Sequence, residues 1–305
     1  MDISAPRPAG PAFELPRILF GDNQFFGVNH MSEDRARAQA MRFRTAGSMI
    51  EVLDWAYAEG IKVFMCTTHE RIAEICEHVR AHPARYADFE FYPCMPYGIK
   101  YANAATEHGV IGALRMFLPR EGALGALLQG GVSLARRDVK AVGELLIDAE
   151  MRMFEGLKTP VIFLQNLVTD LLLGLGFVDA FRIFADHVRT RYRAEPGFIT
   201  MNLPKLLDAL RSLGIDNPVV CASINKIGFR MCGGIDAYES AIATRRFRAI
   251  AMSVMASGAI PAREALHYVC RQGGVRSIVF GASSRSNIRQ TRELIEELSR
   301  SQVAA

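Results

Sequence analysis

The C-terminal part of the chain carries the residues best suited to bind an anion. The apolar stretch Ser277–Phe280 leads into a run of small, hydroxylated and cationic residues: Gly281, Ala282, Ser283, Ser284, Arg285 and Asn287. A strand that breaks into such a turn before a helix presents backbone N–H groups to an anion at the helix N-terminus. A serine alone could act only as a helix cap, but Arg285 adds a cation that a cap does not need. The run predicts a phosphate-binding loop, with Ser253 contributing from the preceding apolar stretch.

Acid–base candidates follow the first two apolar stretches of the chain. Asp22 comes directly after the first stretch, and His69 and Glu70 come shortly after the second. Histidine titrates near neutral pH and a carboxylate can accept a proton or orient a histidine, so these three are the predicted catalytic residues. Two structural alternatives stay open: His69 could begin a helix, and Asp22 could bind backbone N–H groups at a strand end.

Amide and basic side chains also follow the other apolar stretches of the chain. They suit a hydroxylated small molecule that carries a phosphate or other polar groups. The predicted substrate-binding residues are Asn23, Gln24, Tyr97, Gln165, Asn166, Asn202, Asn225, Lys226 and Arg230. Lys226 could alternatively form a Schiff base if burial or a neighbouring cation lowered its pKa. No metal site is expected, because Asp22, His69 and Glu70 do not stand at the spacing of a typical ligand motif.

The composition favours a cytoplasmic protein that acts on a small molecule. The 305 residues are 50% hydrophobic, enough to bury a full core. Lys and Arg number 36 against 32 Asp and Glu, and no basic run is interleaved with aromatic residues, so no nucleic-acid partner is expected. The N-terminus lacks a signal-peptide pattern, and Leu171–Phe177 is too short to cross a bilayer. The six cysteines form no CxxC pair, which fits a reducing compartment. A homo-oligomer is left open.

Apolar stretches alternate with helical runs, which predicts an α/β fold, the (β/α)8 TIM barrel. Residues 1–15 are expected to be a flexible N-terminal segment and residues 16–305 a single barrel domain. The eight strands are expected at Arg17–Gly21, Ile61–Cys66, Phe89–Cys94, Pro160–Gln165, Gly197–Met201, Pro218–Ser223, Ala249–Ser253 and Ser277–Phe280.

Two further local features are predicted. The segment from Pro96 to Thr159, between strands 3 and 4, is longer than one crossover helix requires. This insertion could cover a substrate, pack as an extra helix or contact another subunit. Ser48 to Glu51 has the pattern of a capping box that begins a helix ended by Gly60, and Ser32 could cap an additional helix.

The order of these motifs resembles the aldo/keto reductase superfamily, although the catalytic residues differ. Phe20–Gly27, Glu59–Thr68, Pro196–Asn202 and above all Gly274–Thr291 are similar to that family's first, second, fifth and eighth strand regions. The resemblance implies a barrel that binds NADP or NAD, with the adenosine phosphate on the strand-8 loop.

The family's catalytic Asp, Tyr, Lys and His are not retained in this chain. The Asp falls at Met65 and the Tyr at His69 or Glu70. The Lys falls at Cys94 or Met95 and the His at Gln165 or Asn166, and Ile224 replaces the aromatic residue that stacks on the nicotinamide. The expected function is a non-standard NAD(P)-linked oxidoreductase. One alternative is a redox-neutral lyase, isomerase or aldolase, and another is a non-catalytic binding protein.

Overall fold

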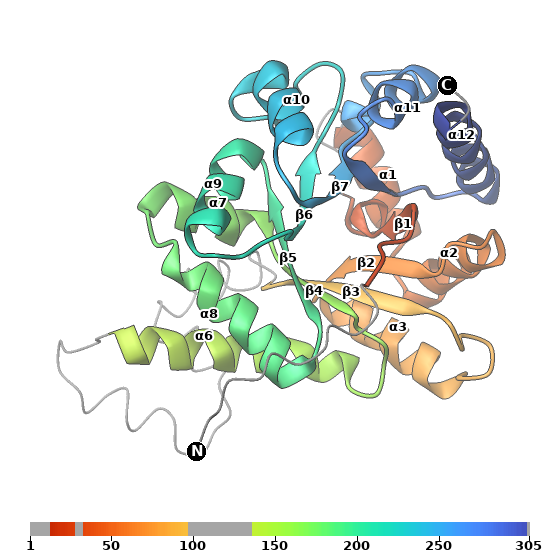
Figure 1. The fold of residues 1–305 in the computed structure, drawn as a ribbon. Helices are drawn as coiled ribbons and strands as arrows, with labels where there is room; N and C mark the ends of the chain where they lie inside the picture. The colour runs from red at the N-terminus through yellow and green to blue at the C-terminus, as the bar shows by residue number, and fades with distance from the viewer. Residues whose placement is uncertain (1–12, 28–32, 97–135, 304–305) are drawn as a thin grey trace.

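The protein is described by a computed structural model, which covers residues 13–27, 33–96 and 136–303 (Figure 1). Eight parallel strands pair in chain order, and β8 pairs back to β1, so the sheet closes into a barrel. The predicted (β/α)8 fold is therefore confirmed. The strands are β1 Ile18–Gly21, β2 Val63–Thr67, β3 Glu90–Met95, β4 Val161–Leu164, β5 Glu195–Thr200, β6 Val219–Ser223, β7 Arg248–Met252 and β8 Val275–Phe280.

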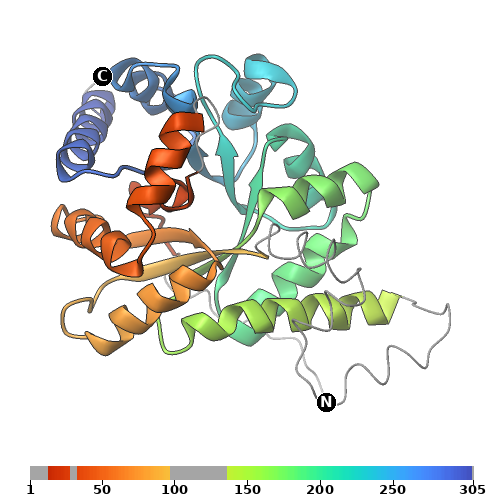
Figure 2. The same cartoon turned by 180° about the vertical axis from the view of Figure 1, so that it is seen from behind.

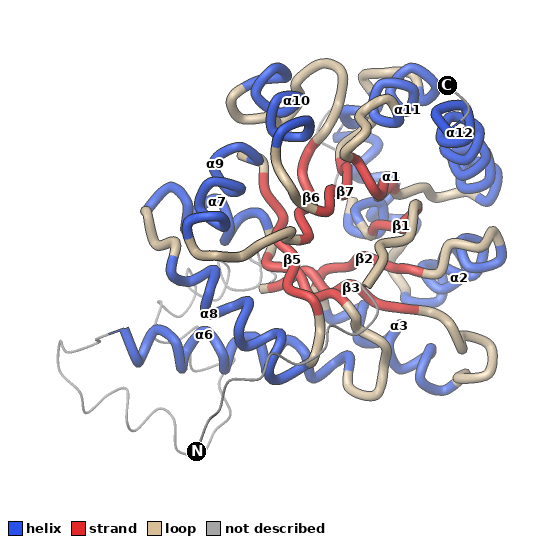
Figure 3. The backbone as a smooth tube through the Cα atoms, viewed as in Figure 1, coloured by secondary structure: helices blue, strands red, loops and turns tan. Residues whose placement is uncertain are grey.

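Helices surround the strands on the outside of the barrel, as both ribbon views and the tube drawing show (Figures 1, 2 and 3). The α-helices are α1 Glu33–Arg42, α2 Ala46–Ala58, α3 Glu70–Ala81, α6 Arg136–Met151, α7 Asn166–Leu175, α8 Asp179–His187, α9 Leu203–Ser212, α10 Gly234–Thr244, α11 Ala262–Cys270 and α12 Arg285–Val303. Short turns of other helix types are η1 Asn23–Phe26, η2 Arg152–Phe154, η3 Val188–Tyr192 and η4 Ala256–Gly258.

The strands are apolar on both faces because each face is buried. Leu19, Met65 and Phe163 belong to the core inside the barrel, whereas Phe20 and Phe64 belong to the layer beneath the helices. This alternation is the period of two that a strand imposes. Large and small residues complement each other inside: a Cβ on Gly197 would lie 2.4 Å from the ring of Phe163.

The observed element bounds differ from the predicted ones in a few places. β5 and β7 begin two and one residues earlier than expected, at Glu195 and Arg248. The expected capping box is wrong: α2 begins at Ala46 after Thr45, and the Ser48 hydroxyl donates to the Thr45 carbonyl at 2.8 Å within the first turn. The buried side chain of Ala46 explains the earlier start, because the apolar face of the helix already includes it.

Some predictions fall on residues outside the described ranges. Ser32 and Tyr97 lie there, and so does the greater part of the 96–159 insertion. The described end of the insertion is α6 with η2, and α6 packs against α8 and β3. The division into an N-terminal segment and one domain stays a prediction.

Candidate active site at the C-terminal mouth of the barrel

Backbone strain is concentrated in two loops at the C-terminal ends of the strands. Six non-glycine residues of the described chain have a positive φ, and four of them follow β6 or β7: Arg230 (56°), Ser253 (54°), Ala256 (45°) and Ser257 (57°). Left-handed backbone is unfavourable for such residues and persists mainly where the surrounding structure enforces it, often at ligand sites. The strain therefore points to this end of the barrel as the functional one.

Asp22 is a buried carboxyl group at the mouth, between β1 and β2. Its side chain is 6% exposed, and its Oδ2 atom accepts hydrogen bonds from the Thr67 backbone N–H at 2.7 Å and the Thr67 hydroxyl at 2.8 Å. Burial raises the pKa of Asp22 more than these two hydrogen bonds lower it. Asp22 is thus a candidate proton donor, and it also binds a backbone N–H as the structural alternative predicted.

His69 and Glu70 stand at the start of α3, after β2, whereas Asp22 follows the neighbouring strand β1. The His69 Nδ1 atom accepts a hydrogen bond from the Arg71 N–H at 3.1 Å, so His69 caps the helix. Its ring lies 4.5 Å from the ring of Phe26. Because Nδ1 accepts, Nε2 is the nitrogen that carries the proton in neutral His69. Glu70 is exposed on the first turn of α3.

Gln24 is buried against the strand-8 loop, and its role in substrate binding stays a prediction. Its Nε2 atom donates to the Gly21 carbonyl at 2.8 Å, and the residue is 5% exposed. A Cβ on Gly281 would lie 1.9 Å from Gln24 Oε1, so only glycine fits there without displacing Gln24. The neighbouring Asn23 is exposed and stays a prediction.

Asn225 has a structural contact that the sequence did not predict. It is fully buried; its Nδ2 donates to the Phe229 carbonyl and its Oδ1 accepts from the Phe229 N–H, both at 2.8 Å. The side chain therefore closes its own loop, and its role in orienting a substrate stays a prediction. Lys226 is exposed, and its Nζ lies 2.6 Å from Glu264. A Schiff base requires a buried or cation-flanked lysine, so the structure does not support that alternative.

At the ends of β4 and β5, the predicted amides stand at helix starts. Gln165 precedes α7, Asn166 begins it, and Asn202 precedes α9. Sequence reasoning missed Asp170, whose carboxylate accepts from the Thr200 hydroxyl at 2.5 Å and from the Met201 N–H at 3.0 Å. This contact ties α7 to the end of β5 and fixes the backbone that presents Asn202.

The strand-8 loop begins α12 with a serine cap and a row of arginines. Ser284 Oγ accepts from the Asn287 N–H at 3.3 Å, so Ser284 is the cap that the alternative interpretation predicted. Arg285 and Arg289 flank a recess of about 320 Å³, with Ser286 between them. Gly281 is exposed, Ala282 and Ser283 are half-buried, and the Ser253 hydroxyl lies 3.3 Å from that of Ser223.

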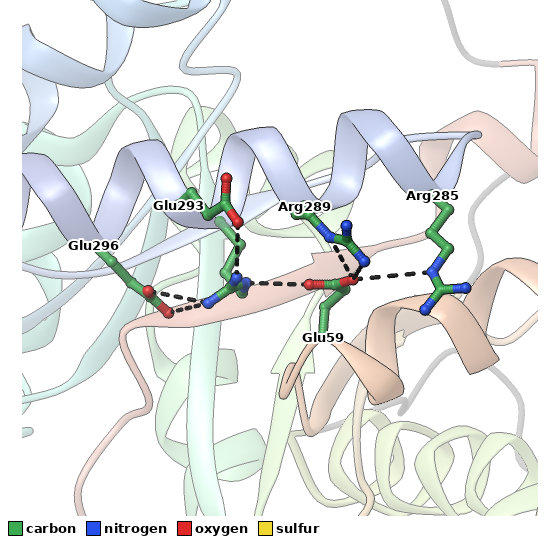
Figure 4. Close-up of polar contacts among 6 residues, drawn as sticks. Glu59, Arg285, Arg289, Glu293 and Glu296 are labelled. Carbon is green, nitrogen blue, oxygen red and sulfur yellow. Dashed lines mark hydrogen bonds and ion pairs between the residues drawn. The ribbon is translucent and has the colours of Figure 1, made fainter.

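Glu59, at the end of α2, faces three arginines of α12 (Figure 4). Arg289 Nη2 lies 3.0 Å and Arg285 Nε 3.9 Å from Glu59 Oε1, and Arg292 Nε lies 3.5 Å from Oε2. Arg292 also pairs with Glu293 and Glu296. Arg289 was missed at the sequence level, although its spacing from Arg285 places both on one helix face. Arg285 and Arg289 line the recess and share the Glu59 carboxylate with Arg292.

The described residues contain neither a cluster of metal ligands nor a membrane-spanning helix. No group of three or more His, Cys, Asp or Glu side chains there could hold a metal ion. His78 and His82 do stand four residues apart, but His78 Nε2 contacts the Tyr86 hydroxyl and His82 Nδ1 contacts the His78 carbonyl. No helix of the described ranges has the length and apolarity that a bilayer crossing needs.

Solved structures with this fold include aldo-keto reductases. A Pseudomonas aeruginosa protein assigned to the aldo-keto reductases aligns with a TM-score of 0.57 and 13% identity over 96% of this chain and 94% of its own. Aldose reductase from Giardia lamblia aligns with a TM-score of 0.51 and 10% identity over 94% and 92%. A variant of Gox0644 in complex with NADPH aligns with a TM-score of 0.52 and 8% identity over 94% and 89%. No protein-family model and no curated protein matches the sequence. The chain has an aldo-keto reductase-like (β/α)8 barrel fold.

Proposed function

We propose that the protein is an NAD(P)-linked oxidoreductase that acts on a small carbonyl compound at the C-terminal mouth of the barrel. The observation that carries the proposal is the recess on α12, where Arg285 and Arg289 share the single carboxylate of Glu59. Two guanidinium groups line the recess at the N-terminal end of α12, and guanidinium groups and helix N-termini both bind phosphate. We assign the cofactor's adenosine phosphate to this recess, with Ser283 and Asn287 beside it.

The loops support the same assignment. In (β/α)8 barrels the loops after strands 7 and 8 frequently bind a phosphate. Here the loop after β7 holds Ser253, Ala256 and Ser257 in left-handed conformations, a cost that a ligand-binding loop explains. The NADPH complex of the Gox0644 variant belongs to a protein of similar fold and is consistent with the proposal.

Asp22 is the residue that we assign to proton transfer. A bound nicotinamide cofactor supplies a hydride to the carbonyl carbon, and the carbonyl oxygen then needs one proton to become a hydroxyl. Both hydrogen bonds from Thr67 end on Oδ2 of Asp22, so Oδ1 is the atom that carries the proton. The raised pKa keeps the carboxyl protonated to a higher pH than an exposed aspartate. His69, which is half-buried, exchanges protons with solvent, and Glu70 lies beside it on the exposed side.

The reaction is expected to be slower than that of an ordinary carbonyl reductase. Met65, which stands where the family has its Asp, is buried in the barrel core at 6% exposure. The family's Lys falls at Cys94 or Met95, and both of these residues are buried. Asp22 therefore acts as the proton donor without the Asp and Lys that support the family's acid.

A redox-neutral lyase, isomerase or aldolase is the second candidate, because the same recess would hold a phosphate carried by the substrate. The non-catalytic alternative is less favoured, since a binding protein has no need of a buried carboxyl group with a raised pKa at the mouth. The six free cysteines support a cytoplasmic location. The exposed row of Leu167, Leu171 and Leu175 on α7 supports contact between copies of the chain.

The proposed chemistry is tested by NADPH consumption against a panel of aldehydes and ketones. We expect slow wild-type turnover that Asp22→Asn abolishes, because an amide cannot act as the proton donor. His69→Ala should reduce the rate less. Equal turnover in the wild type and both variants would show that neither residue takes part.

The alternative is tested by thermal shift with NADP, NAD and sugar phosphates, because a ligand that binds the native state raises the melting temperature. A shift with sugar phosphates and none with NADP or NAD would favour the redox-neutral enzyme.

A further inference from the structure

Arg230 differs from every other half-buried arginine of the described residues. These arginines are Arg17, Arg71, Arg230, Arg245, Arg248 and Arg292. Five of them donate hydrogen bonds to carbonyl or carboxylate oxygens of the protein. The side chain of Arg230 makes no such bond among the described residues, and its guanidinium carbon lies 5.5 Å from the centre of the Phe229 ring. A guanidinium group has five N–H donors, and among the described residues those of Arg230 are left to solvent or to a ligand.

The loop that carries Arg230 is rigid. The Asn225 side chain closes it through two hydrogen bonds to Phe229, and the Met231 N–H donates to the Gly228 carbonyl at 3.2 Å. The Cys232 N–H donates to the Met201 carbonyl at 2.8 Å, which ties the loop to the end of β5. This framework holds Arg230 at a φ of 56°. The protein thus stabilises both an unfavourable backbone conformation and a partly desolvated cation, which is typical of a binding residue.

Arg230 also has a suitable place in the barrel. It follows β6 beside the end of β5, whereas Asp22 lies between β1 and β2, so β3 and β4 separate the two sites on one side of the closed barrel. Burial lowers the pKa of Arg230, but a guanidinium remains charged at neutral pH. An anionic group at Arg230 would place the rest of a substrate over the mouth, toward the proposed proton donor.

We infer that Arg230 binds an oxyanion, a carboxylate or a phosphate, that is part of the substrate. The inference names the substrate class of the proposed oxidoreductase and rests on that function for its place in a reaction. Anion binding itself does not depend on turnover and is measured separately.

The test is isothermal titration of benzoate, phenyl phosphate and neutral benzamide. All variants carry Arg285→Ala, which removes the recess on α12 as a competing anion site. Arg230→Asn is the main variant, because asparagine tolerates left-handed backbone and lacks the charge. Arg230→Lys keeps the charge without the planar fork, and Arg246→Asn, at an exposed arginine before β7, is the matched control.

We expect benzoate or phenyl phosphate to bind more tightly than benzamide. Arg230→Asn should weaken the binding of the anion by about ten- to a hundredfold. Arg230→Lys should be intermediate and Arg246→Asn unchanged. The larger loss identifies the carboxylate or the phosphate as the preferred group. The inference is overturned if Arg230→Asn and Arg246→Asn bind the anion equally well. It is also overturned if the Arg285→Ala protein, with Arg230 and Arg246 unchanged, binds no anion.

A parallel assay separates this inference from the proposed function. NADPH consumption is followed with 4-carboxybenzaldehyde and with benzaldehyde in the wild-type protein. Turnover that favours the carboxylate compound and loses this preference in Arg230→Asn supports both proposals. If NADPH is consumed with neither aldehyde while anion binding still depends on Arg230, the anion site stands and the oxidoreductase proposal fails.

Discussion

Replacing Gly281 by alanine should destabilise the protein because Gln24 occupies the space that the new methyl group needs. The added Cβ would lie 1.9 Å from Gln24 Oε1 and 2.9 Å from its Cδ. Gln24 is 5% exposed and its Nε2 holds the Gly21 carbonyl at 2.8 Å, so it cannot move aside without losing this bond. Breaking a buried hydrogen bond and leaving a partner unsatisfied costs about 1–3 kcal/mol. In a chain of this size, that lowers the melting temperature by about 2–5 °C.

The assay is calorimetric unfolding of the wild type and four variants. Gly273→Ala is the matched control, because nothing lies within 4 Å of its Cβ, and its melting temperature should stay close to that of the wild type. The double variant Gln24→Ala with Gly281→Ala should be no less stable than Gln24→Ala alone, since the obstructing side chain is then absent. Additive losses in the double variant, or a Gly281→Ala protein as stable as Gly273→Ala, would refute the contact between the β1 turn and the strand-8 loop.

Two further predictions concern buried polar groups of the mouth. Asp22 has a raised pKa in the fold, so it contributes stability below its unfolded pKa of about 4 and loses it as the pH rises through the folded value. Asp22→Asn should therefore raise the melting temperature at pH 8 and bring little gain at pH 4, and a gain confined to pH 4 would contradict this. Asn225→Ala should lower the free energy of unfolding by about 2–4 kcal/mol, because it removes two buried hydrogen bonds. Urea unfolding measures this loss, and a change below about 0.5 kcal/mol would show that the loop does not need the amide.

The barrel could be predicted from the sequence because its strands are apolar on both faces and recur between helical runs. The strand starts could not, and Glu195 and Arg248 show why. Each is a charged residue that looks unfavourable in a strand when considered alone, but the two form an ion pair of 2.5 Å between β5 and β7. Such a partner is 53 residues away and becomes visible only in the folded chain.

The meeting of residues from the ends of β1 and β2 was predictable from the order of the strands, whereas the contacts of the amides were not. Strand ends of a parallel barrel meet at one mouth, so Asp22 and Thr67 come together as their places at the ends of β1 and β2 require. Whether an amide at a strand end faces a ligand or its own loop depends on the conformation of that loop. Asn225 uses its amide on Phe229, and Gln24 uses its amide on Gly21. Neither arrangement has a marker in the sequence.

The most direct test of the proposed cofactor site is the binding of NADPH, followed by its fluorescence on titration with the wild-type protein and three variants. Arg285→Ala and Arg289→Ala should each weaken the binding of NADPH by about 1–3 kcal/mol, because each removes a charge-assisted contact with the phosphate. Arg246→Ala, an exposed arginine at the start of the β7 region, should bind NADPH as the wild type does. Binding of NADPH that all three variants retain equally, or no binding by the wild type, would contradict the account.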